Sequence, residues 1–163
     1  VRFEGQNDSN INTTAKIDVL LSYYGLINFD LVNKDFDNLG VWPLLRYFAG
    51  NVGDDDPKKS YVGSFLGKRI KDLSQEELDN VTPNTRINEN IYNKDLKVFI
   101  AHGTADITVP ILQSIRLAQD FSAYLGKENV TYKEFKNFRH GDDKFYKNEG
   151  IKVLSDYLEN VLS

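Results

Sequence analysis

Two residues of this chain, Asp106 and His140, have the types and the order along the sequence that acid–base catalysis requires. An imidazole can take a proton from a nucleophile as a general base and return it to a leaving group as a general acid. A carboxylate beside the imidazole holds the required tautomer and stabilises the imidazolium that forms. The two residues are therefore candidates for the acid and the histidine of a Ser–His–Asp triad.

Each candidate also has an ordinary structural explanation. An Asp before a helix often caps the helix or closes a turn, and a loop histidine is often a plain surface side chain. The order favours catalysis, because one class of serine hydrolases has nucleophile, acid and histidine in that sequence, with the nucleophile in Gly-x-Ser-x-Gly. No such pattern occurs between Val1 and Ser163, and the nearest run, 63–67, has its serine at the wrong offset. The chain is expected to supply the acid and the histidine but no nucleophile.

The remaining polar candidates favour structural interpretations. His102, the only other histidine, comes directly before a glycine at the end of an apolar run and is predicted to be structural. His140, Asp142 and Asp143 provide a single imidazole and no metal-ligand spacing, so neither a metal nor a cofactor is expected. Basic and aromatic residues alternate over 133–139, as in some single-strand nucleic-acid binders, but an edge strand explains that run better.

Composition narrows the class of protein. A length of 163 residues, with 40% hydrophobic and 27% charged residues, suits one globular domain. A net charge of −4 argues against a nucleic-acid partner, and no apolar run approaches the roughly 18–20 residues that span a bilayer. The absence of cysteine excludes disulfides and thiolate metal sites but leaves the compartment unknown, and no signal peptide is visible.

The chain contains no methionine and begins at Val1. Removal of an initiator methionine would explain this observation. Together with the missing nucleophile, however, it leads us to expect a chain shortened at its N-terminus, that is, a single incomplete domain over residues 1–163.

The apolar pattern predicts a parallel α/β layer. Strands are expected at 17–24, 96–101 and 130–135; the first is expected to be buried on both faces, and the last to lie at an edge. A helix should begin around Pro110 and end at Gly126, and a second helix should close the chain. Their buried faces are expected at Ile111, Leu112, Ile115, Ala118, Phe121 and Leu125, and at Ile151, Leu154, Tyr157, Leu158, Val161 and Leu162. Asp106 and His140 then follow successive strands, where open α/β sheets place functional groups.

A long insertion, about residues 26–95, separates the first two strands and must have structure of its own. Residues 35–48 predict a helix interrupted near Pro43, and residues 59–70 predict a second short helix. Ser74 and Glu77 have the spacing of a capping box. The insertion could cover an active site as a cap or could be a peripheral helical decoration, and the sequence does not decide between these alternatives.

At these residues the chain resembles the C-terminal part of α/β-hydrolase esterases, in the feruloyl-esterase-like and acetyl-esterase-like branch related to prolyl oligopeptidases. The matching runs are Ser-Tyr-Tyr-Gly at 22–25, Ser-Phe-Leu-Gly at 64–67, Val-Thr-Pro at 81–83, His-Gly-x-x-Asp-x-x-Val-Pro-x-x-Gln-Ser at 102–114 and His-Gly-Asp-x-x-Phe at 140–145. The resemblance implies that Asp106 and His140 are triad members. It also implies that a nucleophile elbow and an oxyanion loop lie upstream of Val1.

Two functions remain as hypotheses. The first is a serine carboxylic-ester hydrolase (an esterase or lipase-like enzyme) acting on a small-molecule ester, in which this chain provides Asp106 and His140 and is inactive alone. The second is a non-catalytic binding or interaction module that keeps the hydrolase architecture. If earlier strands are missing, the apolar strand at 18–24 is expected either to pair with the N-terminal part of the domain or to self-associate.

Overall fold

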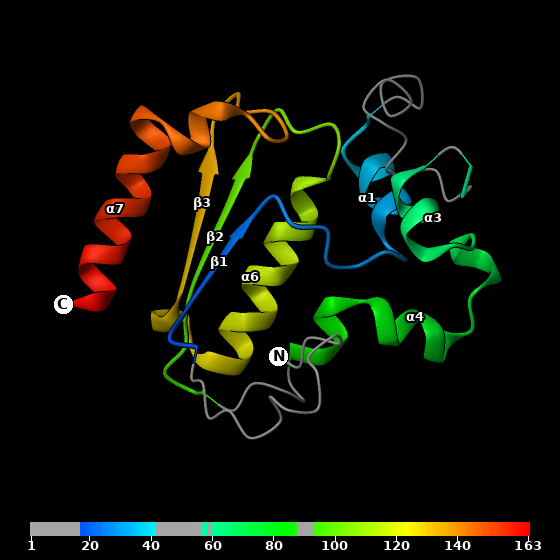
Figure 1. Ribbon diagram of the computed structural model, residues 1–163, viewed down its shortest axis with the longest axis horizontal. Coiled ribbons are helices and arrows are strands. Elements are labelled where there is room, and N and C mark those ends of the chain that lie inside the picture. Colours follow the sequence, from blue (N-terminus) through cyan, green and yellow to red (C-terminus); the bar gives the residue numbers. More distant parts are fainter. Residues whose placement is uncertain (1–16, 42–56, 59, 88–92) are drawn as a thin grey trace, which may run out of the picture.

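The computed structural model describes residues 17–41, 57–58, 60–87 and 93–163 (Figure 1). The helix interruption predicted near Pro43 lies outside the described residues.

The described strands form one parallel sheet in the order β1 (Val19–Tyr23), β2 (Lys97–Gly103) and β3 (Val130–Phe135). Helix α6 (Ile111–Leu125) covers one face, and α7 (Asn148–Leu162) covers the other (Figure 1). The predicted α/β fold, parallel strands with flanking helices, is therefore confirmed.

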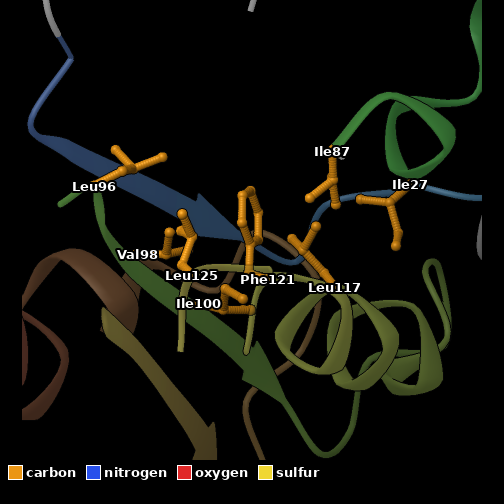
Figure 2. Close-up of a cluster of buried hydrophobic side chains, with 8 residues drawn as sticks. All are labelled: Ile27, Ile87, Leu96, Val98, Ile100, Leu117, Phe121 and Leu125. Atoms are coloured by element: carbon orange, nitrogen blue, oxygen red, sulfur yellow. The ribbon is translucent and has the colours of Figure 1, made fainter. Parts of the chain in front are cut away.

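The buried side chains of β2 alternate between the two faces of the sheet. Val98 and Ile100 pack against the α6 residues Leu117, Phe121 and Leu125 (Figure 2). The intervening β2 side chains, Phe99 and Ala101, point to the α7 face, where their cluster includes Phe135, Phe138, Phe145 and Tyr157. Because helices cover both faces of the sheet, the side chains on both sides of β2 are buried, and the sequence of this strand is therefore a continuous apolar run.

Strand β2 extends further than predicted. The expected strand ended at residue 101, but His102 and Gly103 continue the ladder opposite Glu134 and Phe135. Gly103 also lets the loop after β3 approach β2 closely, because a Cβ at this position would overlap the carbonyl of Phe138. The strand therefore places its last side chain, His102, inside the protein.

The expectation that β1 is buried on both faces is wrong. Most of its side chains are only partly buried, and Leu21 is 41% exposed. Among the described strands β1 pairs only with β2, so its other edge has no strand partner in the described part of the chain. A fully buried parallel strand requires neighbours that cover both faces.

Helix α6 keeps its predicted limits, with Pro110 before its first residue and Gly126 after its last. Its buried face differs from the prediction, because Gln113, Ser114 and Leu117 are buried while Ile111, Leu112 and Ile115 are only partly buried. In α7 the expected core positions Leu154, Tyr157, Leu158 and Val161 pack on the sheet, but Ile151 and Leu162 are exposed.

The segment between β1 and β2 includes several short helices among its described residues. It contains α1 (Val32–Asn38), α3 (Tyr61–Leu66) and α4 (Gln75–Val81), with short 3-10 turns at Ile70–Asp72 and Pro83–Arg86. Helix α1 begins before the predicted residue 35 and ends at residue 38, whereas α3 falls within the predicted 59–70. The capping box is confirmed: Ser74 Oγ accepts from the Glu77 amide at 3.2 Å, and Glu77 returns a carboxylate to the Ser74 amide at 2.9 Å.

This helical segment is joined to α6 by a buried polar network. Gln113 accepts from the amides of Ile27 and Asn28 at 3.2 and 2.8 Å and donates to Asp35 at 2.6 Å. Arg116 binds the same Asp35 carboxylate through both terminal nitrogens. The side chains of Asp35 and Gln113 are fully buried, so each must be hydrogen-bonded to be stable there.

Replacing Asp35 with alanine should lower the free energy of unfolding by about 3 kcal/mol, because it leaves Gln113 and Arg116 without their shared partner. Urea denaturation followed by circular dichroism measures this change. Lys68→Ala is the matched control: it breaks an ion pair to Glu77 whose partners are both exposed, and it should cost less than about 1 kcal/mol. Equal losses for the two variants would contradict the role assigned to the buried network.

Candidate active site

Asp106 lies in the turn that follows β2, and its side chain is fully buried. Its Oδ1 accepts hydrogen bonds from the amides of Thr108 and Val109 at 2.8 and 2.9 Å. This is the turn-closing role that the sequence offered as the alternative explanation. It occupies only one of the two carboxylate oxygens.

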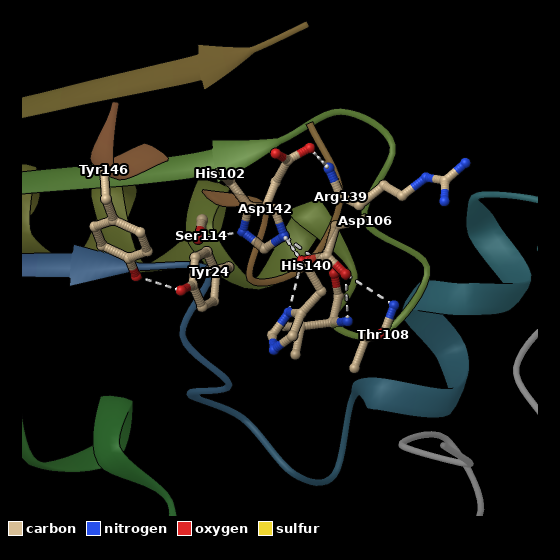
Figure 3. Close-up of polar contacts among 10 residues, drawn as sticks. Tyr24, His102, Asp106, Thr108, Ser114, Arg139, His140, Asp142 and Tyr146 are labelled. Carbon is tan, nitrogen blue, oxygen red and sulfur yellow. Dashed lines mark hydrogen bonds and ion pairs between the residues drawn. The ribbon is translucent and has the colours of Figure 1, made fainter. Parts of the chain in front are cut away.

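The second oxygen, Oδ2, meets His140, whose Nδ1 lies 2.8 Å away (Figure 3). The structure thus brings together the two residues that the sequence selected. Because a carboxylate only accepts, the contact requires the proton of His140 on Nδ1. In the neutral ring Nε2 is then free to act as a base, and the side chain is 33% exposed.

Backbone hydrogen bonds join the loops that present these two residues. The amides of Thr104 and Ala105 donate to the carbonyls of Phe135 and Phe138 at 2.9 and 3.0 Å. Thr104 also accepts from the amide of Asn137, a residue with a positive φ of 63°, at 2.9 Å. Asparagine tolerates this left-handed conformation better than most residues. The loop after β3 is therefore fixed against the loop after β2.

The end of β1 contributes an aromatic wall. The ring of Tyr24 packs edge-on against His140, with 4.6 Å between ring centroids, and its amide donates to the Ala101 carbonyl at 2.8 Å. The Tyr24 hydroxyl shares a hydrogen bond with that of Tyr146 (Figure 3). The site is therefore built at the carboxyl ends of all three parallel strands, the usual place for function in such sheets.

His102 is a site contact that sequence reasoning missed. It was predicted to be only structural, but its Nε2 lies 3.2 Å from Oδ2 of Asp106. The other ring nitrogen lies 2.7 Å from Ser114 Oγ. The four-residue spacing from His102 to Asp106 carries no local signal for this contact, which depends on the chain turning back after β2.

Electrostatics favour an ionised acid. Burial alone would raise the pKa of Asp106, but hydrogen bonds from His102, His140 and the Val109 amide outweigh it and lower the pKa to about 2. Burial, the Tyr146 hydroxyl and the nearby Asp106 charge raise the pKa of Tyr24 to about 12. At neutral pH the site therefore holds a carboxylate and a protonated phenol beside the imidazole.

The described part of the chain lacks three other features. It contains no cluster of three or more His, Asp or Glu side chains that could hold a metal ion. No serine among those residues hydrogen-bonds to His140, and Ser64 of the near-elbow run lies in α3. None of the described helices combines the length and apolarity needed to cross a membrane.

No model of a known protein family matches the chain. Among curated proteins it is similar to acyl-protein thioesterase 1 of Emericella nidulans, with 29% identity over 118 residues. That alignment covers 72% of this chain and 43% of the thioesterase, so the chain spans less than half the length of this relative. This similarity supports the resemblance of the chain to hydrolases of the α/β-hydrolase type, and nothing finer. It does not select the feruloyl-esterase-like or acetyl-esterase-like branch.

Asp106→Asn should reduce stability at neutral pH and flatten its dependence on pH. A carboxylate whose folded pKa is depressed stabilises the fold above its unfolded pKa, and the effect is lost as pH falls through the folded value. For Asp106 this window runs from 3.8 down to about 2, which corresponds to about 2 kcal/mol.

Urea unfolding of both proteins between pH 7 and pH 2 measures this effect. The stability difference between them should shrink by about 2 kcal/mol as the pH falls through the window. Asp156→Asn is the control, because its ion pair with Lys152 on α7 is exposed. A wild-type advantage of constant size at every pH would show that the buried carboxylate is not the source.

Proposed function

We propose that this chain carries the acid and the histidine of a serine carboxylic-ester hydrolase. The observation that supports it most directly is the 2.8 Å contact between Asp106 Oδ2 and His140 Nδ1, at the ends of neighbouring parallel strands. The residue types, their order and their location match the requirements of a hydrolase triad. The nucleophile, in this proposal, is a serine from a segment outside residues 1–163.

In the proposed reaction His140 Nε2 removes the proton of the serine hydroxyl as its oxygen attacks the ester carbonyl. Asp106 stays ionised and stabilises the imidazolium through its bond to Nδ1. The imidazolium then protonates the leaving alkoxide, which departs as the alcohol. In the second half, His140 deprotonates water, the resulting oxygen attacks the acyl–serine ester, and the proton returns to the serine.

The substrate class we propose is a small acyl ester or an acetylated-sugar ester, as the resemblance in the sequence implies. The similarity to an acyl-protein thioesterase adds acyl thioesters as a second type of substrate to test. The segment between β1 and β2 acts as a cap in this proposal. Its core, built on Phe29, Val32 and Phe36, includes Val109, which lies in the turn that holds Asp106.

The test is hydrolysis of p-nitrophenyl acetate, and of an acetyl thioester, by a protein that contains both this chain and the nucleophile segment. His140→Ala should lower kcat/KM by roughly 10³-fold or more, because the imidazole moves every proton in the reaction. Lys152→Ala, on the exposed face of α7, should leave turnover unchanged. Near-normal turnover in the His140 variant would contradict the assignment, and a folded protein inactive on every ester would favour the binding-module alternative.

We further propose that the strand leading to the nucleophile pairs with the free edge of β1. Among the described strands that edge has no partner, and Leu21 and Ile17 are 41% and 47% exposed. An apolar parallel strand with an open edge promotes association. Such pairing would bring a serine in the turn that follows that strand to the same end of the sheet as His140.

This chain made alone should therefore be inactive on esters and should self-associate, with β1 as the contact. Size-exclusion chromatography with light scattering measures its mass, and hydrogen exchange reports the protection of β1. Adding the N-terminal segment should dissolve the assembly and restore turnover. A stable monomer at high concentration with β1 already protected would show that the chain closes its own sheet.

A further inference from the structure

His102 is a fully buried histidine that the reaction described above does not use. It lies near the end of β2, with its ring directed into the turn that follows the strand (Figure 3). Its Nε2 is 3.0 Å from the carbonyl oxygen of Val109 and 3.2 Å from Oδ2 of Asp106. Its Nδ1 is 2.7 Å from the hydroxyl of Ser114 on α6.

These contacts determine where the ring proton lies. A carbonyl and a carboxylate can only accept, so Nε2, which faces both, must carry a proton. The Ser114 hydroxyl can donate, and it therefore satisfies Nδ1 of a neutral ring. Every polar atom of this buried side chain then has a partner, as burial requires.

We infer that His102 is a positioning residue that fixes the carboxylate of Asp106 for His140. Its Nε2–H, which donates to the Val109 carbonyl, lies 3.2 Å from Oδ2, the same oxygen that accepts from His140 Nδ1. The catalytic meaning of this arrangement rests on the proposed function. The arrangement itself can be tested without any turnover.

The positioning follows from the number of donors around one carboxylate. Oδ1 accepts from the backbone amides of Thr108 and Val109, and Oδ2 accepts from His140 while the His102 Nε2–H lies 3.2 Å away. His140 is partly exposed and comes from a loop, whereas His102 is fully buried on the central strand. His102 therefore keeps Oδ2 in place when His140 moves, and the placed oxygen in turn selects the Nδ1–H tautomer of His140.

The first experiment is a nitrogen-15 NMR spectrum of the unmutated chain labelled at histidine. The chain contains two histidines, and His140→Gln assigns their signals. His102 should be protonated on Nε2, and the neutral form of His140 should carry its proton mainly on Nδ1. A His102 ring protonated only on Nδ1 would overturn the proposal at this step, whatever the activity of the protein.

The second experiment compares three variants by the tautomer of His140. His102→Leu removes the donor at similar volume and should reduce the Nδ1–H population of His140 to less than half. His102→Gln can still donate and should retain most of it. Ser114→Ala is the matched control, because it removes a hydrogen bond from the same buried ring at the far nitrogen and should leave the tautomer of His140 unchanged. If the leucine variant does not fold, the glutamine and alanine variants carry the comparison.

Equal shifts of the His140 tautomer in His102→Leu and Ser114→Ala would overturn the proposal, because they would indicate a general loosening of the site. No shift in His102→Leu would also overturn it, because the tautomer of His140 would then not depend on His102. Loss of the Nδ1–H form in His102→Gln would overturn it as well. In the protein that contains the nucleophile, His102→Leu should lower kcat by roughly 10–100-fold with KM unchanged. The expected tautomer shifts in a protein without esterase activity would refute the proposed function and leave the positioning role of His102 standing.

Discussion

The site depends on one carboxylate with four hydrogen-bond donors. The N–H groups of two backbone amides and two imidazoles surround Asp106, as many as the roughly four acceptor sites of a carboxylate. The bonds overcome the cost of burying the charge and keep the group ionised at neutral pH. The surrounding elements serve this group: β2 brings His102, the turn brings the amides, and the loop after β3 brings His140.

The same turn links the sheet to the helical segment between β1 and β2. Val109 donates its amide to Asp106, accepts from His102 through its carbonyl, and packs its side chain among Phe29, Val32 and Phe36. In the first turn of α6, the Gln113 side chain accepts from the amide of Asn28, at the start of the helical segment, and donates to Asp35. Val109 therefore connects the core of the helical segment directly to Asp106.

Much of the fold was predictable, because it depends on local patterns: apolar runs ended by glycine, Pro110 and Gly126 at the limits of α6, and the capping box at Ser74. Asp106 and His140 were predictable as candidates because strand ends are where such sheets place function. The contacts of Gln113 and Tyr24 were not, since each joins residues far apart in the sequence, and that of His102 depends on how the chain turns back after β2. The partial exposure of β1 was also missed, because burial depends on neighbours that a strand's own residues do not reveal.

The most direct test of the central claim is a crystal structure of the protein that contains this chain and its nucleophile segment, after reaction with an organophosphonate. Our account predicts one modified serine, with its bridging oxygen within about 3 Å of His140 Nε2 and with His140 Nδ1 still bound to Asp106. A modified serine remote from His140, or a protein that does not react while remaining folded, would contradict it.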